Sequence, residues 1–319
     1  MRVLVTGGAG LVGSNVVAVA ADRGDDVSAI VRARPPRPDS RCRYVVLDLL
    51  DAGGVRAAVA DARPDAIIHT AIWNDFAGIY ADRRRAWRSY VEVTRMLAGA
   101  ANAVGAVLVT VSTDWVFDGT QPMADEQTPP NPINYYGVLK AASELVTLEA
   151  ARQPVVARLA GVVGVQRAGR RAARQQDAGF GYFVDGVVAA LSAGRPCTVW
   201  ESEAINSVAT PSLATLSAER MLELAERGSR GVFHCCAGEP TTRMALALRA
   251  ADAFGLDASL LRSAPPDAAD LPPAPVPFDT SLDARATARE LGCDPLPLDE
   301  LLARFRAERS AAEAFSAAE

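Results

Sequence analysis

The amino-acid sequence predicts an α/β fold with a doubly wound parallel sheet and a smaller C-terminal cap. Over about the first 160 residues, short β-branched runs alternate with longer helical stretches, an alternation that is typical of parallel βαβ units. The β-branched runs are nearly all apolar, as strands are when helices cover both faces of a sheet. A glycine-rich turn directly follows the first run.

The elements of the sheet are expected before Gly164. The strands are Arg2–Thr6, Val27–Val31, Tyr44–Asp48, Ala66–His69, Val107–Ser112 and Val155–Leu159. The helices between them are Leu11–Arg23, Gly54–Ala62, Arg83–Val104 and Tyr136–Arg152. Helices between successive strands imply right-handed parallel crossovers.

After Gly164 the pattern becomes less regular. We expect, in order, a helix at Gly181–Ala193, a strand at Cys197–Trp200, a helix at Leu213–Arg227, a strand at Gly231–Cys235, a helix at Thr242–Phe254, a proline-rich connector at Pro265–Pro277 and two short helices. The later strands are expected to rejoin the first sheet. The predicted domains are therefore residues 1–162 with about 196–236, and a cap of about 163–195 and 237–319.

Composition excludes several classes of protein. A net charge of −5 over 319 residues argues against nonspecific binding to nucleic acid, and no apolar run approaches the roughly 18 residues of a membrane span. The N-terminal residues enter a strand-like run without a signal-peptide layout. Five scattered cysteines without a Cys-x-x-Cys pair indicate reduced thiols and a cytoplasmic protein. No metal site is expected on His69 and His234, which each end an apolar run.

The glycine-rich turn predicts a dinucleotide site. Gly7, Gly10 and Gly13 follow the first strand, and an apolar helix begins within the motif. Glycines at these positions permit a tight turn, close approach to a pyrophosphate and helix–strand packing, while the helix N-terminus favours the phosphates. A purely structural turn is the alternative. In this context the motif predicts a Rossmann-type domain.

The end of the second strand favours NADPH over NADH. An NAD site usually carries an acid there to hold the ribose 2′-hydroxyl, whereas this sequence has Arg32 and Arg34. Guanidinium groups can hold a 2′-phosphate in bidentate fashion, although arginine is common throughout this chain. Asp48, at the end of the third strand, either accepts from the adenine amino group or caps the next helix.

The only lysine of the chain lies beside a tyrosine. Tyr136 and Lys140 are four residues apart on a predicted helix, so they share one face. A neighbouring ammonium stabilises a phenolate and lowers the pKa of the phenol, which suits acid–base catalysis; an incidental surface pair is the alternative. Thr113, after the fifth strand, is at the edge where open α/β sheets bind ligands, and its hydroxyl can donate to a substrate carbonyl oxygen.

These motifs together resemble the extended short-chain dehydrogenases/reductases, and within them the dTDP-4-dehydrorhamnose reductases and related sugar-nucleotide 4-ketoreductases. The segments that carry the resemblance are Val5–Gly13, Ile68–Ala71, Ser112–Gly119 and Tyr135–Lys140, with weaker likeness at Gly231–His234 and Asp279–Asp283. The resemblance implies that Thr113, Tyr136 and Lys140 are catalytic, with Tyr136 protonating the nascent alkoxide while NADPH delivers hydride. The further contacts that it implies are Leu11, Val12, Leu49, Thr70 and Ala71 for the cofactor, and Asp114 and Trp115 for the substrate.

The sequence departs from its relatives at three positions. Trp115 stands where the related 4,6-dehydratases have the glutamate of Thr-Asp-Glu, and because tryptophan cannot transfer a proton, plain reduction is favoured. Tyr90 aligns with the asparagine of a Val-Asn-Val-type segment, which changes either a proton relay or the shape of the pocket. Val276 replaces the arginine of a common Arg-Pro pair and so removes one expected substrate contact.

Two arginine clusters are candidates for holding the substrate. Arg167, Arg170, Arg171 and Arg174 share one helical face, in the region where relatives hold the nucleotide diphosphate, and we predict contacts from Arg170 and Arg171. Arg83–Arg85 form the second cluster. For both clusters a solvated surface is the alternative.

The sequence therefore predicts an NADPH-dependent reductase that acts on a nucleotide-linked 4-keto sugar. An epimerase or a reductase of a non-sugar carbonyl is one alternative, and a catalytically silent NADP-binding regulatory subunit is another. The helices Arg83–Val104 and Tyr136–Arg152 are those through which extended members often form homodimers, so the sequence is compatible with either a homodimer or a monomer.

Overall fold

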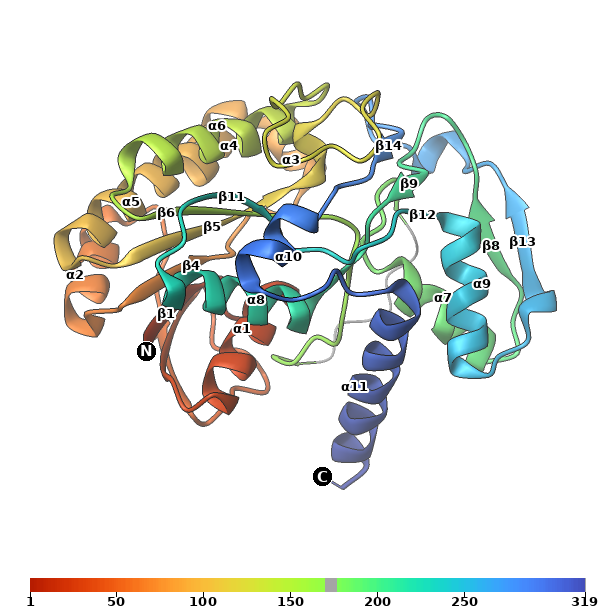
Figure 1. The fold of residues 1–319 in the computed structure, drawn as a ribbon, viewed down its shortest axis with the longest axis horizontal. Coiled ribbons are helices and arrows are strands. Elements are labelled where there is room, and N and C mark those ends of the chain that lie inside the picture. The colour runs from red at the N-terminus through yellow and green to blue at the C-terminus, as the bar shows by residue number, and fades with distance from the viewer. Residues whose placement is uncertain (170–176, 319) are drawn as a thin grey trace.

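The structure, a computed structural model, describes residues 1–169 and 177–318. At its centre is a parallel sheet with the strand order β11-β6-β5-β4-β1-β2-β3 (Figure 1). The predicted doubly wound sheet is thereby confirmed. Its strands are β1 (Arg2–Thr6), β2 (Asp26–Val31), β3 (Cys42–Val46), β4 (Ala66–His69), β5 (Val107–Thr113), β6 (Pro154–Leu159) and β11 (Gly231–His234).

Helices cover both faces of this sheet because successive side chains of its strands, which point to opposite faces, are apolar. Val3 and Val5 of β1 belong to the core beneath α1 (Leu11–Asp22) and α8 (Ala214–Arg227), while Leu4 belongs to the core beneath α2 (Ala52–Ala62) and α5 (Val93–Val104). Helix α6 (Tyr135–Ala150) packs beside α5 (Figure 1). The chain winds in opposite directions on either side of β1, so the switch point lies between β1 and β4, where open sheets bind ligands.

The helical segment that follows β4 is more elaborate than predicted. An additional short helix, α3 (Phe76–Ala81), precedes α4 (Arg83–Trp87). The side chains of Asp75 and Asp82 accept from the Gly78 and Arg85 backbone N–H groups, each at 2.9 Å, and so cap these two helices. A π-helical turn, Arg88–Glu92, then joins α4 to α5 within the single helix predicted over 83–104.

A smaller unit lies at the other end of the molecule (Figure 1). Its core joins apolar faces of three helices, including the buried Phe183, Leu246 and Phe305. The helices of this unit are α7 (Phe183–Ser192), α9 (Arg243–Phe254) and α11 (Leu298–Ala318), and its strands are β8 (Cys197–Trp200), β9 (Val208–Ala209), β12 (Thr241–Thr242), β13 (Leu261–Ala264) and β14 (Asp279–Thr280). Strands β7 (Val162–Val163) and β10 (Ser212–Leu213) pair between the two units.

The strand at Cys197–Trp200 does not rejoin the central sheet, contrary to the expectation for 196–236. This strand, β8, pairs with β13 instead, and within 196–236 only β11 pairs with the central sheet, beside β6. In β8 Val199 is buried whereas Thr198 is exposed, so one face of the strand contacts helices and the other contacts water. Strands of the central sheet are covered on both faces, and β8 lacks the second apolar face that such a position requires.

The C-terminal region also differs from the prediction of a cap with two short helices. Helix α10 (Arg285–Leu291) is short but packs on the central unit, where Leu291 joins the core of α1 and α8. Helix α11 is 21 residues long, because Leu298, Leu302 and Phe305 recur at helical spacing and pack into the core of the smaller unit. The chain therefore returns to the central unit within the segment predicted as cap.

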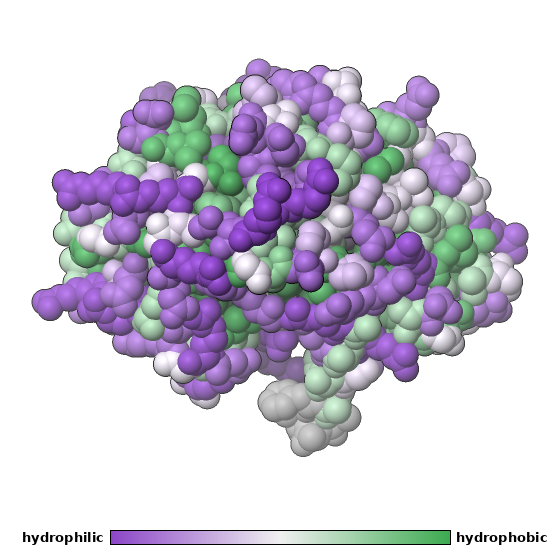
Figure 2. Space-filling model, in the orientation of Figure 1, coloured by the Kyte–Doolittle hydropathy of each residue, from purple (hydrophilic) through white to green (hydrophobic). Residues whose placement is uncertain are grey.

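The visible surface is mainly polar. On the face drawn in Figure 2, hydrophilic residues cover most of the area and apolar residues form small separate patches. None of the helices in the described part of the chain combines the length and the apolar composition needed to cross a membrane.

Candidate active site

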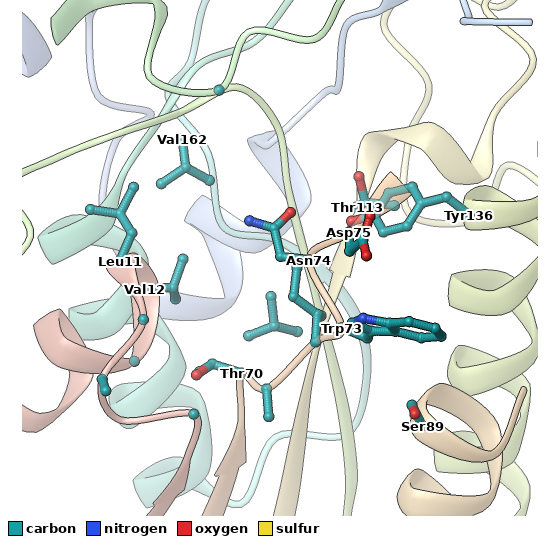
Figure 3. A pocket seen from close by; sticks show the side chains of 18 of the residues that line it. Leu11, Val12, Thr70, Trp73, Asn74, Asp75, Ser89, Thr113, Tyr136 and Val162 are labelled. Carbon is teal, nitrogen blue, oxygen red and sulfur yellow. The ribbon is translucent and has the colours of Figure 1, made fainter. Parts of the chain in front are cut away.

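A cleft of about 1360 Å³ lies at the carboxyl ends of the central strands. Residues after β1, β2, β4 and β5 form one wall, and residues 161–162, 177–182 and 270–272 contribute from the other side. Figure 3 shows Leu11 and Val12 at one side of this cleft and Thr113, Tyr136 and the Trp73 ring at the other, with Asn74 between them. The cleft thus extends from the glycine-rich turn to the predicted catalytic residues.

The glycine-rich turn packs so closely that two of its glycines admit no side chain. Gly7 has a φ of +75°, and a Cβ there would lie 2.8 Å from the backbone nitrogen of Ala71. A Cβ on Gly13 would lie 2.2 Å from the carbonyl oxygen of Gly7 and 2.6 Å from Thr70 Oγ1. Helix α1 begins directly after Gly10 without a side-chain cap, so its N-terminal N–H groups and dipole face the cleft and favour an anion.

Arg32, the residue after β2, also lines the cleft. Asp48 and Leu49 line it after β3. The Asp48 carboxylate accepts from the Leu50 N–H at 2.9 Å, whereas the cap of α2 is Asp51, which accepts from Gly54 N at 3.0 Å. Asp48 is therefore not the cap of the next helix, and its contact with the adenine amino group stays a prediction.

Tyr136 and Lys140 enter the cleft from the first turns of α6. Asn134 caps this helix by accepting from the Gly137 N–H at 2.8 Å. Lys140 is 5% exposed and its Nζ donates to the Val111 carbonyl oxygen at 2.9 Å. Burial lowers the pKa of Lys140 to about 8, opposed by the Glu144 carboxylate, so the ammonium form predominates at neutral pH.

The pKa of Tyr136 is not lowered as the sequence led us to expect. Burial raises it above the usual value for tyrosine, a hydrogen bond with Thr113 partly opposes this, and the Asp114 carboxylate raises it further. The prediction was wrong because it considered the neighbouring charge and not the loss of solvent, which favours the neutral phenol. Tyr136 is therefore a neutral, protonated phenol at neutral pH.

A buried carboxylate orders the hydroxyl groups next to Tyr136. Thr113 Oγ1 donates to Asp114 Oδ1 at 2.9 Å, and Thr280 of β14 donates to Asp114 Oδ2. Asp114 is 3% exposed, and burial raises its pKa to about 6 while these hydroxyl groups lower it. Since Thr280 belongs to the smaller unit, Asp114 connects the end of β5 to that unit.

Three aromatic rings form a wall beside the Tyr136 hydroxyl. The ring centroids of Phe76, Trp115 and Tyr136 are 5.4 to 6.0 Å apart in pairs, distances typical of favourable aromatic contacts. Val276 packs with Trp115 in the same apolar cluster. At Val276, where relatives commonly have an arginine, this chain therefore has a side chain that supports the aromatic wall.

The two histidines have structural environments. His69 Nδ1 and Thr6 Oγ1 are 2.7 Å apart, and burial lowers the pKa of His69 to about 3. The Nδ1 of His234 lies 2.9 Å from the Asp283 carbonyl oxygen. In residues 1–169 and 177–318, no three His, Cys, Asp or Glu side chains are grouped so as to hold a metal ion.

The family model described as RmlD substrate binding domain matches residues 1–310. The chain belongs to the RmlD substrate-binding domain family. Methionine adenosyltransferase 2 subunit beta of Xenopus tropicalis is 30% identical over 269 residues, which are 82% of this chain and 74% of that protein. dTDP-4-dehydrorhamnose reductase of Streptomyces griseus is 35% identical over 150 residues, 46% of this chain and 45% of that enzyme. The predicted resemblance to extended short-chain dehydrogenases/reductases is confirmed.

A solved member of the same group confirms the fold. The structure of dTDP-4-dehydrorhamnose reductase from Bacillus anthracis in complex with NADP has a TM-score of 0.75 against this chain. The alignment covers 96% of this chain and 98% of that one, with 21% sequence identity. The RmlD-family fold therefore extends over both units of the molecule.

Most of the site residues predicted from sequence line this one cleft. Two of the exceptions, Arg170 and Arg171, lie outside the described residues, so the structure does not place them. The predicted residues that line the cleft are Gly7, Gly10, Leu11, Val12, Gly13, Arg32, Asp48, Leu49, Thr70, Ala71, Thr113, Asp114, Trp115, Tyr136 and Lys140.

Two arginines lie differently from the predictions, and a third, Arg85, lies where a contact with the substrate was a candidate. Arg34 does not line the cleft, because β2 ends at Val31 and the chain bends, so that side chains two residues apart no longer share a face. Arg167 Nε donates to Asn15 Oδ1 of α1 at 2.8 Å and is engaged there. In the cluster 83–85, Arg85 lines the cleft, with its guanidinium 4.7 Å from the centroid of the Trp73 ring.

Several residues that line the cleft were not predicted from the sequence. Residues 73–76 come shortly after β4, which ends at His69, so their place beyond the carboxyl end of a strand was a usable signal. Gln166 was not foreseeable, because it reaches the glycine-rich turn from a distant segment and donates to the Ala9 carbonyl oxygen at 2.6 Å.

Proposed function

We propose that this member of the RmlD family is an NADPH-dependent reductase of a keto group on a nucleotide-linked sugar. The observation that carries the proposal is that Thr113, Tyr136 and Lys140 line the same cleft as the glycine-rich turn. A proton donor and a dinucleotide cradle in one cleft are what the reduction of a carbonyl requires.

The cradle fits a dinucleotide phosphate. At Gly7 and Gly13 a Cβ would meet backbone atoms within 3 Å, and this close packing leaves the N-terminus of α1 open toward the pyrophosphate. Arg32, which lines the cleft, would hold the 2′-phosphate, with Asp48 and Leu49 beside the adenosine. When bound, NADPH supplies the hydride that reduces the carbonyl carbon.

The side chains of α6 supply the proton. The Tyr136 hydroxyl donates to the carbonyl oxygen as negative charge develops there. Lys140, charged below its pKa of about 8, would stabilise the resulting phenolate and would hold ribose hydroxyls with its remaining N–H groups.

For Thr113 we propose a role that differs from the one the resemblance implies. It donates its only hydroxyl hydrogen to Asp114 and also accepts from the Trp115 N–H at 3.3 Å. We therefore assign Thr113 to orienting the Tyr136 hydroxyl, whose pKa it lowers against the effect of burial, instead of donating to the substrate. Asp114 likewise acts through Thr113 and Thr280, while Trp115 forms a wall of the substrate site.

The test follows NADPH absorbance with a panel of nucleotide-linked 4-keto sugars and the corresponding non-keto nucleotide sugars. Consumption of NADPH with a keto sugar alone, abolished in Tyr136→Phe, is the expected result. Formation of an isomer without net consumption of NADPH indicates an epimerase. Reduction of simple ketones with no preference for the nucleotide-linked ones indicates a non-sugar carbonyl reductase.

A second candidate function is a regulatory subunit that binds NADP without catalysis. The relatives named methionine adenosyltransferase 2 subunit beta favour it, since that name makes each a subunit of another enzyme. Tight NADPH binding without turnover of any substrate in the panel, together with a partner enzyme that co-purifies in a fixed ratio, would establish this function.

A further inference from the structure

The π-helical turn Arg88–Glu92 places an aromatic ring against the lone lysine. A π-helical turn adds one residue to a helical turn and is often found at functional sites. Tyr90 lies within this turn and is 4% exposed. Its carbonyl oxygen accepts from Thr94 Oγ1 at 2.7 Å, a side-chain bond that supports the irregular backbone.

Tyr90 contacts both predicted catalytic side chains of α6. Lys140 Nζ lies over its ring, 5.6 Å from the centroid. The ring of Tyr136 meets it edge to face, with centroids 6.2 Å apart and planes at 85°. The Tyr90 hydroxyl donates to the Trp73 carbonyl oxygen at 3.1 Å, which fixes the ring to the segment after β4.

The other groups around Lys140 are a backbone carbonyl, a balanced carboxylate and an uncharged histidine, so the Tyr90 ring is the aromatic group that stabilises the ammonium charge. Val111 of β5 offers a carbonyl oxygen. Glu144, one turn further along α6, is paired with the buried Arg158 at 2.8 Å, so its negative charge is largely balanced. His69 of β4 is uncharged at neutral pH because burial lowers its pKa to about 3.

We propose that Tyr90 is a positioning residue whose ring keeps the Lys140 ammonium charged and directed at the reaction site. The electron-rich face of an aromatic ring attracts a cation, and the attraction is stronger where water is excluded. The ring also packs against Tyr136, so one side chain sets the positions of both. The catalytic part of this inference rests on the proposed reductase function; the effect on Lys140 does not.

Because Lys140 is the only lysine, its charge can be measured directly. Full-length protein grown with ¹³C,¹⁵N-lysine gives a single lysine side-chain spectrum, whose ¹³Cε shift reports protonation across a pH titration. We expect Tyr90→Leu to lower the midpoint by roughly one pH unit, since a unit corresponds to the strength of a buried cation–π contact. Tyr90→Phe, which keeps the ring and loses only the bond to Trp73, should keep the wild-type midpoint.

A second substitution separates ring electrostatics from packing. A trifluorinated phenylalanine at position 90 has nearly the shape of phenylalanine but a weakened negative face, so it should lower the Lys140 midpoint relative to Tyr90→Phe. This comparison remains decisive if Tyr90→Leu does not fold. Equal midpoints for the fluorinated and unfluorinated rings overturn the proposal.

Kinetics then connect the charge to the reaction. The pH at which kcat declines on the alkaline side should fall in the fluorinated variant by the same amount as the midpoint, with the Kd for NADPH unchanged. If no substrate is reduced, the reductase proposal fails while the spectroscopic midpoint still tests Tyr90. A midpoint that moves without any movement of the kinetic profile contradicts the catalytic role of Tyr90.

Discussion

The two halves of the cleft are built in different ways. The half proposed to hold the cofactor, called the cofactor half, comprises the glycine-rich turn 7–13, Arg32 and Asp48 and consists mainly of backbone and short segments that follow central strands. The half proposed to hold the substrate, called the substrate half, comprises Phe76, Trp115 and residues 177–182 and 270–272 and combines side chains from separate segments of both units. Local sequence fixes the cofactor half, whereas tertiary packing fixes the substrate half.

Tyr136 lies where the two halves meet. Removal of its hydroxyl should therefore lower the rate of the chemical step without changing the binding of cofactor or substrate. Tyr136→Phe removes the proton donor but keeps the ring in the aromatic wall. General acid catalysis typically contributes about 100- to 10,000-fold, and we expect kcat to fall by that factor with the Kd for NADPH unchanged. Stopped-flow measurement of NADPH oxidation and fluorescence titration of NADPH check the two expectations.

The control for this change is Tyr135→Phe. The Tyr135 hydroxyl donates to the Arg83 carbonyl oxygen at 2.9 Å and does not line the cleft, so kcat should stay within about twofold of the wild type. Equal losses in the two variants would show that Tyr136 acts through helix stability and not as the acid.

Gly13→Ala should disable the cofactor half alone. The added methyl group would lie 2.2 Å from Gly7 O, and such overpacking costs about 1–3 kcal/mol of unfolding free energy. Displacing the turn also misplaces several N–H donors, each worth about 1.5–3 kcal/mol to an anion, so the Kd for NADPH should rise roughly 100-fold. Gly99→Ala is the matched control, because nothing lies within 4 Å of its added carbon in α5, and it should leave NADPH binding unchanged.

The same contrast explains what the sequence could predict. Tyr136 and Lys140 are four residues apart on one helix, so the pair is visible in the sequence, as is the glycine spacing. Asp114 and Thr280 are 166 residues apart, and no local sequence pattern predicts their hydrogen bond. The direction of the Tyr136 pKa was missed for a related reason: burial depends on which distant segments cover a side chain.

The placement of Cys197–Trp200 shows the same limit within the fold. The run was correctly predicted as a strand because β propensity and alternation are local. Its partner, β13, could not be identified from sequence, because strand pairing depends on which segments tertiary folding brings together. The π-helical turn around Tyr90 was likewise invisible within a helix whose ends were predicted.

Arg32→Ala tests selectivity within the cofactor half. Loss of a charge-assisted hydrogen bond to a 2′-phosphate costs about 1.5 kcal/mol or more, which corresponds to roughly tenfold weaker NADPH binding, and the affinity for NADH should not change. Arg34→Ala, on a side chain that does not line the cleft, should leave both affinities unchanged. Isothermal titration calorimetry measures the affinity of each variant for both cofactors. Equal losses of NADPH and NADH affinity in Arg32→Ala would contradict recognition of the 2′-phosphate by Arg32.

The smallest expected effect comes from the substrate half. Trp115→Leu removes a ring that contacts both Phe76 and Tyr136, and aromatic pairs contribute about 0.5–1.5 kcal/mol beyond the area they bury. KM for the keto sugar should therefore rise roughly two- to tenfold, with the Kd for NADPH unchanged. Trp87→Leu is the control, because Trp87 is 41% exposed on α4 and does not line the cleft. If Trp115→Leu weakens NADPH binding as much as it raises KM, the two halves are not separable, and the aromatic wall supports the cofactor site as well as the substrate.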